Sequence, residues 1–194
     1  MPDAAPAVPA ATVIVLRPAT TDFEVLLLRR SSRSNVHGGA WVFPGGHVDP
    51  EDFDIEAPAD GFIAARNAAV RETSEEAGLT ITAERLVYFS HWTTPLSRPK
   101  RFSTWFFVTD ESIEQSVRVD GQEINAHRWL SPRQALQEQR DGTMNLPPPT
   151  FVSLSRLCLF RTANDAFNEA RKQDAEVFFP KLFKVDGGHC SIYQ

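Results

Sequence analysis

Runs of β-branched, aromatic and other hydrophobic residues alternate along the chain with polar segments that contain glycine or proline. The first two runs, 12–16 (TVIVL) and 23–28 (FEVLLL), are joined by PATTD, a composition typical of a turn or short loop. Similar runs follow at 85–91, 101–108 and 123–130, and the last of them alternates in polarity. The pattern therefore predicts five strands, with a proline-containing loop between the third and the fourth.

The last third of the chain carries helix signals. Ser131 is a good N-cap for a short helix at about 132–139, and a further helix is predicted over 162–172. Thr150 can cap a helix with an apolar stripe, which comprises Phe151, Leu154, Leu157 and Cys158. Residues 176–193 are read as irregular structure with strand pieces. We expect these C-terminal elements to cover the core or to form the surface of a homodimer.

A central helix is predicted to begin after Asp60, a good N-cap, and to end at Gly78, a residue type that stops helices. At about 100° per residue, three acids fall within an arc of about 100° on this helix, namely Glu72, Glu75 and Glu76. The opposite side, which we expect to face the core, carries Ile63, Val70, Ser74 and Ala77. Small residues near the acidic arc would let the Gly45–Gly46 loop pack closely there, and these are Ala64, Ala65, Ala68 and Ala69.

The acidic arc predicts a site for a divalent metal ion. Like charges three or four residues apart destabilise a helix by a few tenths of a kcal/mol per pair unless a cation offsets them. Mg²⁺ and Mn²⁺ prefer oxygen ligands and are commonly shared with substrate phosphates. The three glutamates could bind such an ion together with a backbone carbonyl of Gly45 or Gly46. The alternative is a solvated helix face on which Arg66 and Arg71 screen the acids.

Composition narrows the class of protein. With 194 residues and 42% hydrophobic content, the chain can bury the core of one domain. The formal net charge of -5 argues against binding to nucleic acid. Cys158 and Cys190 show neither a disulfide framework nor metal-binding spacing, so we expect reduced thiols and a cytoplasmic location. No apolar run approaches the roughly 20 residues of a membrane span, and the Ala/Pro-rich residues 1–11 are predicted to form a flexible tail.

The central motif resembles that of the Nudix hydrolase family. Residues 71–79 (RETSEEAGL) reproduce the pattern R-E-x-x-E-E-x-G followed by an aliphatic residue, and residues 46–52 (GHVDPED) look like its opening half. Gly46 and Arg71 are 25 positions apart, more than is usual in the family, and Asp52 stands in place of a glutamate. The extra residues, about 53–61, are read as an inserted surface loop, which costs little loop-closure entropy.

The resemblance implies a fold and an activity. We expect a single domain over residues 12–194, with the motif at 45–79 and a helical extension at about 146–194. The implied fold is of the α/β (α+β) class, an α/β/α sandwich with a mixed central β-sheet plus C-terminal helices. The implied reaction is hydrolysis of the diphosphate linkage of a nucleoside diphosphate derivative, with Mg²⁺ or Mn²⁺ as cofactor. The partner would be this small molecule, with no nucleic acid or membrane involved.

Further segments are similar to a branch of the family that cleaves coenzyme A and its esters, and they include VFPGGHVD, SHWTTPLSRPKRFSTWFFV and LPPPTF. The coenzyme A signature places an arginine four residues before the glycine of GxxxFPGG. Gly39 fits that glycine, but position 35 is Asn35 and Arg33 lies two residues earlier. Two alternatives are the same chemistry on ADP-ribose, NADH or a nucleotide sugar, and a nucleotide-binding module without activity.

Catalytic roles also follow from the resemblance. Glu72, Glu75 and the third glutamate of the arc, Glu76, would bind the metal ion, and Arg71 would orient a neighbouring glutamate. The base that accepts a proton from the attacking water would be Glu75 or Glu123. An ordinary exposed strand residue is the alternative for Glu123.

Several residues are candidates for contact with the substrate. Arg30 and Arg33 follow the second predicted strand and could bind phosphates, although they could equally make a strand end soluble. Gly45 permits a close approach of the backbone, and His91 and Arg101 flank the proline-containing loop. His91 could instead be a surface histidine.

Overall fold

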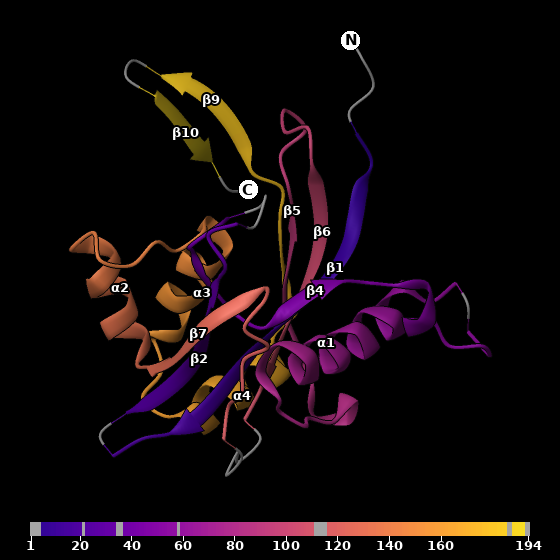
Figure 1. Cartoon of the computed structure of the whole chain (residues 1–194), viewed down its shortest axis with the longest axis horizontal. Helices are drawn as coiled ribbons and strands as arrows, with labels where there is room; N and C mark the ends of the chain where they lie inside the picture. Colours follow the sequence, from indigo (N-terminus) through magenta and orange to yellow (C-terminus); the bar gives the residue numbers. More distant parts are fainter. Residues whose placement is uncertain are drawn as a thin grey trace.

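A mixed β-sheet of eight strands forms the middle of this protein, whose computed structural model describes residues 5–20, 22–33, 37–57, 59–110, 116–185 and 188–192. The strand order is β3-β2-β1-β6-β5-β8, with β4 paired to β1 and β7 paired to β2. The strands are β1 (Ala7–Pro18), β2 (Phe23–Arg30), β3 (Trp41–Val42), β4 (Gly45–His47), β5 (Val87–Thr93), β6 (Arg101–Thr109), β7 (Ile124–Leu130) and β8 (Glu176–Phe178). A separate antiparallel hairpin, β9 (Lys181–Val185) and β10 (Gly188–Ile192), extends away from the helices (Figure 1).

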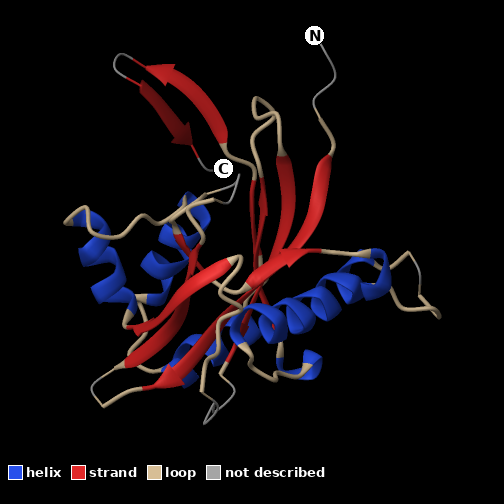
Figure 2. Ribbon diagram, viewed as in Figure 1, coloured by secondary structure: helices blue, strands red, loops and turns tan. Residues whose placement is uncertain are grey.

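Helices cover both faces of the sheet (Figure 2). α1 packs on one face, and the three C-terminal helices pack on the other. The helices are α1 (Gly61–Ala77), α2 (Pro132–Arg140), α3 (Pro148–Leu157) and α4 (Ala163–Lys172), with short 3-10 turns at η1 (Pro50–Asp52) and η2 (Ala83–Arg85). This arrangement confirms the predicted α/β/α sandwich with a mixed sheet.

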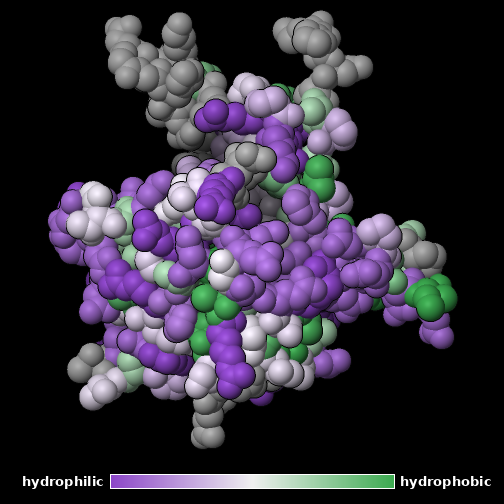
Figure 3. Space-filling view, in the orientation of Figure 1, coloured by the Kyte–Doolittle hydropathy of each residue, from purple (hydrophilic) through white to green (hydrophobic). Residues whose placement is uncertain are grey.

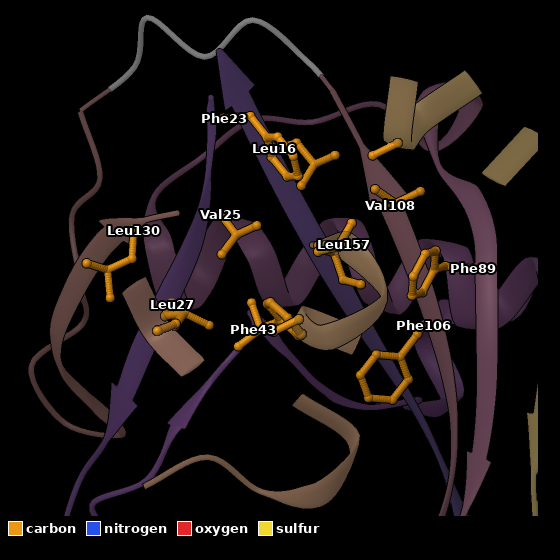
Figure 4. Packing of buried hydrophobic residues seen from close by; sticks show 14 of the residues in the cluster. Leu16, Phe23, Val25, Leu27, Phe43, Phe89, Phe106, Val108, Leu130 and Leu157 are labelled. Carbon is orange, nitrogen blue, oxygen red and sulfur yellow. The ribbon is translucent and has the colours of Figure 1, made fainter. Parts of the chain in front are cut away.

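Strand β1 contributes to both hydrophobic cores because successive side chains of a strand point to opposite faces. Val13 and Val15 pack with the alanines of α1, whereas Ile14 and Leu16 pack with residues of the C-terminal helices such as Leu157. Figure 4 shows this second cluster, in which side chains from β1, β2, β6 and α3 meet. β1 therefore joins the two layers of helices through one strand.

β1 is longer than the predicted strand 12–16, and it corrects the expected flexible tail. Ala7 to Val15 pairs in parallel with Arg101 to Thr109 of β6, and Ala11 is fully buried. The ladder forms with a strand that is distant in the sequence, so the local Ala/Pro-rich composition does not reveal it. Residues 7–11 are thus part of the sheet, and residues 1–4 lie outside the described residues.

α1 has the predicted bounds but a different buried face. The Asp60 carboxylate accepts hydrogen bonds from the backbone N–H groups of Phe62 and Ile63, and Gly78 ends the helix with φ 66°. Ala77 is buried as predicted, whereas Ile63, Val70 and Ser74 are half-buried or exposed. The buried side chains are Ala64, Ala65, Ala68, Ala69, Thr73, Glu76 and Ala77. Small side chains let α1 approach the sheet closely, so the face that carries no large apolar residue is the one that packs.

The C-terminal elements lie close to their predicted positions. The Ser131 hydroxyl caps α2, and the Thr162 hydroxyl caps α4. α3 begins at Pro148 with Pro147 as its N-cap, so Thr150 lies in the first turn and is not the cap as predicted. Proline suits the first helical position, which Pro148 occupies, because its fixed φ is helical and its missing N–H has no partner in a first turn. Among the described residues, no helix is long and apolar enough to span a membrane.

The end of α1 gives a test of the fold. Replacing Gly78 by Ala should lower the free energy of unfolding by about 1–2 kcal/mol for the left-handed backbone alone. The loss should be larger than that, because an added Cβ would lie 3.2 Å from backbone and side-chain atoms of Arg118. Gly142→Ala is the matched control, since Gly142 has φ +73° and its Cβ would meet no described atom within 4 Å. Urea denaturation showing equal losses for both variants would contradict this packing.

Candidate active site

The predicted motif lines a cleft of about 1800 Å³ between α1, β4 and the loops that follow β2 and β5. One part of its lining is acidic and comprises Asp49, Glu72, Glu75, Glu76, Asp120 and Glu123. A second part is basic and comprises Arg30, Arg33, His37, Arg98 and Lys100. A third part includes aromatic residues and prolines, namely Phe43, Trp92, Phe102, Phe106 and Pro147 to Pro149. The surface over α1 is mainly hydrophilic (Figure 3).

The Gly45–Gly46 segment packs directly against the acids of α1. The Gly45 N–H donates a hydrogen bond of 2.9 Å to Oε2 of Glu76. A Cβ on Gly46 would overlap the Glu72 carboxylate, and a Cβ on Gly45 would overlap the backbone of β1 at Ala11. Position 45 therefore requires glycine, whereas a side chain at position 46 would displace the Glu72 carboxylate. The close approach predicted for this loop is present.

Arg71 connects the acids of the motif. Its Nε and Nη2 atoms donate to both carboxylate oxygens of Asp52, at 3.0 and 2.9 Å. Its Nη1 atom donates to Glu72 at 3.1 Å and to Glu75 at 3.2 Å, while Nη2 also donates to the His47 carbonyl at 3.0 Å. Bidentate pairing fixes the plane of the guanidinium. This geometry is what the predicted orienting role of Arg71 would require.

Asp52 makes more contacts within the site than its place in the sequence motif indicated. Its side chain is only 4% exposed, and its carboxylate accepts the backbone N–H of Asp49 at 2.8 Å in addition to the contacts with Arg71. Its backbone carbonyl accepts a hydrogen bond from the Asn67 side chain at 2.9 Å. The turn η1 thus places the Asp52 carboxylate beside α1, where it pairs with Arg71.

Burial dominates the electrostatics of two of the glutamates. It raises the pKa of Glu76 to about 8, and although the Gly45 N–H opposes this shift, the Glu72 carboxylate adds to it. Burial also raises the pKa of Glu72, against the lowering effect of Arg71. Two acids are therefore held in a region that disfavours their charged forms when no cation is present.

The donor set fits a hard divalent cation, because it consists of carboxylate oxygens beside the Gly45–Gly46 backbone. In the conformation described, no group of three or more His, Cys, Asp or Glu side chains converges on one point among the described residues. Glu75 turns to Arg71, and Glu76 accepts the Gly45 N–H. Glu72, Glu75 and Glu76 lie together on the wall of the cleft, and binding of an ion would require their carboxylates to turn towards it.

Glu123 reaches the same cleft from the start of β7. Its carboxylate lies 4.0 Å from Nη2 of Arg30, and its charge contributes to the raised pKa of Glu76 after the effect of burial. The Asp120 carboxylate accepts the backbone N–H of Glu123 at 3.0 Å and that of Ile124 at 2.9 Å, which fixes the turn before the strand. The structure therefore brings Glu123 and Arg30 to the acids of α1, far from both in sequence.

Two residues predicted to contact the substrate, His91 and Arg101, do not line this cleft. His91 bonds to the Ser103 hydroxyl at 2.8 Å and packs edge-on against Trp105, so it lies on the side of the sheet away from the cleft. Its neighbour Trp92 lines the cleft instead, because adjacent strand residues face opposite sides. Arg101 donates to the backbone carbonyls of Thr94 and Ala5 and is not part of the cleft lining.

Other cleft residues were not singled out from the sequence. They are His47, Asp49, Arg98, Lys100, Phe102 and Asp120. The SRPK segment did carry a signal, since two cations in a proline-containing loop next to a strand can reach a ligand. Asn35 lies outside the described residues.

Comparisons with known proteins identify the family of this chain. A family model described as the NUDIX domain matches residues 6–148. The chain is 25% identical to the acyl-coenzyme A diphosphatase NUDT19 of Xenopus laevis, over 75% of this chain and 62% of the relative. It is 29% identical to putative nudix hydrolase 7 of Caenorhabditis elegans, over 76% of this chain and 59% of the relative. The chain thus spans about three fifths of the length of these relatives.

Solved structures show the same fold. A NUDIX hydrolase from Alicyclobacillus acidocaldarius superposes with a TM-score of 0.74 at 26% identity, covering 84% of this chain and 96% of that one. The NUDIX domain of Shewanella oneidensis NrtR, complexed with ADP ribose, has a TM-score of 0.60 at 17% identity and covers 80% and 90% of the two chains. The match of the family model over most of the chain, together with the motif on α1 and β4, shows that this chain belongs to the Nudix family.

Proposed function

We propose that this protein hydrolyses the diphosphate linkage of a nucleoside diphosphate derivative, with Mg²⁺ or Mn²⁺ as cofactor and coenzyme A or an acyl-coenzyme A as substrate. The observation that carries the proposal is the packing of Glu72 and Glu76 against Gly45 and Gly46 in the wall of a large cleft. Buried carboxylates are expensive to keep without a cation, and a nucleotide diphosphate needs one for catalysis.

Each residue of the motif has a proposed role in this reaction. Glu72, Glu75 and Glu76 would bind the ion with the help of the Gly46 carbonyl, and Arg71 would keep two of these carboxylates in position. When bound, the ion would neutralise charge on the phosphoryl oxygens and lower the pKa of a bound water.

The water oxygen forms a new bond to one phosphorus as the bond from that phosphorus to the bridging oxygen breaks. The products are two monophosphates, which for coenzyme A are phosphopantetheine and adenosine 3′,5′-bisphosphate. Glu75 and Glu123 remain the two candidates for the base that accepts the proton of the water. Both line the cleft, and their side chains are 58% and 72% exposed, so either can meet a water molecule.

Substrate phosphates have donors close to the acidic wall. Arg30 and Arg33 line the cleft at the end of β2 and in the loop that follows it. A guanidinium can bind two phosphate oxygens at once, which suits a diphosphate. Gly45 also lines the cleft, and its contact with the substrate stays a prediction.

Coenzyme A is favoured as substrate by the names of the relatives and by the shape of the cleft. Three of the relatives are named acyl-coenzyme A diphosphatase, two at 25% and 26% identity over about three quarters of this chain and one at 33% over 40% of it. Beyond the charged part, the cleft continues along Trp92, Phe102 and the prolines before α3. That apolar lining can contact the pantetheine or acyl portion of the substrate through hydrophobic burial.

A panel of substrates tests the proposal. Phosphate-bond cleavage should be measured with Mg²⁺ and with Mn²⁺ on coenzyme A, acyl-coenzyme A, ADP-ribose, NADH and nucleoside triphosphates. We expect coenzyme A or its esters to give the highest kcat/KM and chelation by EDTA to abolish turnover. A higher kcat/KM on ADP-ribose or NADH would show that coenzyme A is not the preferred substrate. Absence of turnover with every compound would favour a nucleotide-binding module without activity.

The role of the buried acid can be tested separately. Glu76→Gln keeps the shape of the side chain but removes a charged ligand, so turnover should fall by about 10²-fold or more. The affinity for Mn²⁺, followed by electron paramagnetic resonance, should fall as well. Glu84→Gln is the control, because Glu84 is exposed and does not line the cleft. Full activity of the Glu76 variant would contradict the assignment.

The pairing of Asp52 with Arg71 predicts a smaller loss of activity than the loss of a metal ligand. Asp52→Asn removes the charge that fixes the guanidinium, and outer partners of metal ligands typically contribute about 10–100-fold to activity. We expect kcat to fall in that range while KM changes little. Asp49→Asn provides the comparison, because the Asp49 side chain is 50% exposed and lies 3.4 Å from Arg71. A larger loss from the Asp49 variant would show that the assignment of the support is wrong.

A further inference from the structure

The loop between β5 and β6 places two cations on the cleft that the proposed hydrolysis does not use. Arg98 and Lys100 are exposed and line the cleft. Within the part of the chain that the structure describes, no carboxylate oxygen lies within 4.0 Å of either side chain. The Lys100 ammonium lies 5.3 Å from the ring centre of Phe102, which also lines the cleft. Both cations are thus available to an anionic ligand.

These cations continue a basic surface that begins beside the catalytic acids. Arg30 lies 4.0 Å from Glu123 and its charge acts on Glu76, so it borders the acidic wall. The charges of Arg30 and Arg98 both act on His37, whose pKa is lowered first by burial and then by these two arginines. His37, Arg30 and Arg98 all line the cleft, so Arg98 adds to the basic part of its lining from the loop between β5 and β6.

We propose that Arg98 and Lys100 form a second anion subsite, which binds a phosphomonoester on the ribose of the nucleotide. For the substrate class proposed above this group is the 3′-phosphate of coenzyme A, so the inference rests on the proposed function and extends it. The diphosphate already has Arg30, Arg33 and the acidic wall with its ion. Arg98 and Lys100 come from a different loop, between β5 and β6, and they supply the cleft with cations for a second phosphate, the one on the ribose.

The chemistry of the two side chains suits a phosphomonoester. The guanidinium of Arg98 can donate two parallel hydrogen bonds to phosphate oxygens, and the ammonium of Lys100 adds a compact charge. ADP-ribose and NADH carry no phosphate at this place, so they would leave both cations without a partner. The subsite would therefore select coenzyme A over nucleotides that differ from it on the ribose.

Binding of two ligands without a diphosphate tests the subsite. Calorimetric titration of the full chain with adenosine 3′,5′-bisphosphate and with 5′-AMP gives the ratio of their dissociation constants. We expect the bisphosphate to bind at least about tenfold more tightly to the unmodified protein. In Arg98→Ala/Lys100→Ala the ratio should fall to below about threefold. A ratio near one in the unmodified protein, or an unchanged ratio in the variant, would overturn the inference.

A matched variant and a separate assay complete the design. Arg140→Ala/Arg161→Ala removes the same charge from two exposed residues that do not line the cleft, and it should keep the original ratio. A fall in this control would mean that net charge alone explains the preference. Because neither ligand is cleaved, the ratio is independent of catalysis. Absence of coenzyme A hydrolysis with a tenfold ratio would refute the proposed function alone, whereas hydrolysis with a ratio near one would refute the subsite alone.

Discussion

The close approach of the Gly45–Gly46 backbone to the acids of α1 is the contact on which the site depends. Gly45 lies against β1 and donates to Glu76, and Gly46 lies so close to Glu72 that a side chain there would displace the Glu72 carboxylate. The approach is possible because α1 faces the sheet with alanines, whose small side chains bring the helix axis close to β1 and β4. The packing of the core and the position of the carboxylates are therefore consequences of the same small residues.

Arg71 and Asp52 stabilise this arrangement from the other side. The Asp52 carboxylate is buried and binds the guanidinium through two hydrogen bonds, while Asn67 holds the backbone of the same turn. The longer segment between Gly46 and α1 begins only after this anchor. Additional residues can be accommodated there, because the contacts that orient the acids are made by Asp52 before this segment and by α1 after it.

Local signals in the sequence were sufficient for much of the fold. The caps at Asp60 and Gly78 determined where α1 begins and ends, because both act through hydrogen bonds within the first and last turns. The acidic pattern on one turn of helix and the paired glycines indicated the chemistry before any contact was known. The start of β1 was missed because its partner, β6, is far away in the sequence, and sheet pairing is not a local property.

The amino-acid sequence by itself thus determined the family, the helix that carries the acids and the glycine loop beside it. Only the tertiary structure decided which side chains face the cleft. His91 and Arg101 border a loop with several charged residues. The alternation of side chains along β5 directs His91 away from the cleft, and Arg101 donates a hydrogen bond to the Thr94 carbonyl of the loop. Arg98 and Lys100 reach the cleft instead. Side-chain direction on a strand depends on register and on distant partners, and these exist only once the sheet has formed.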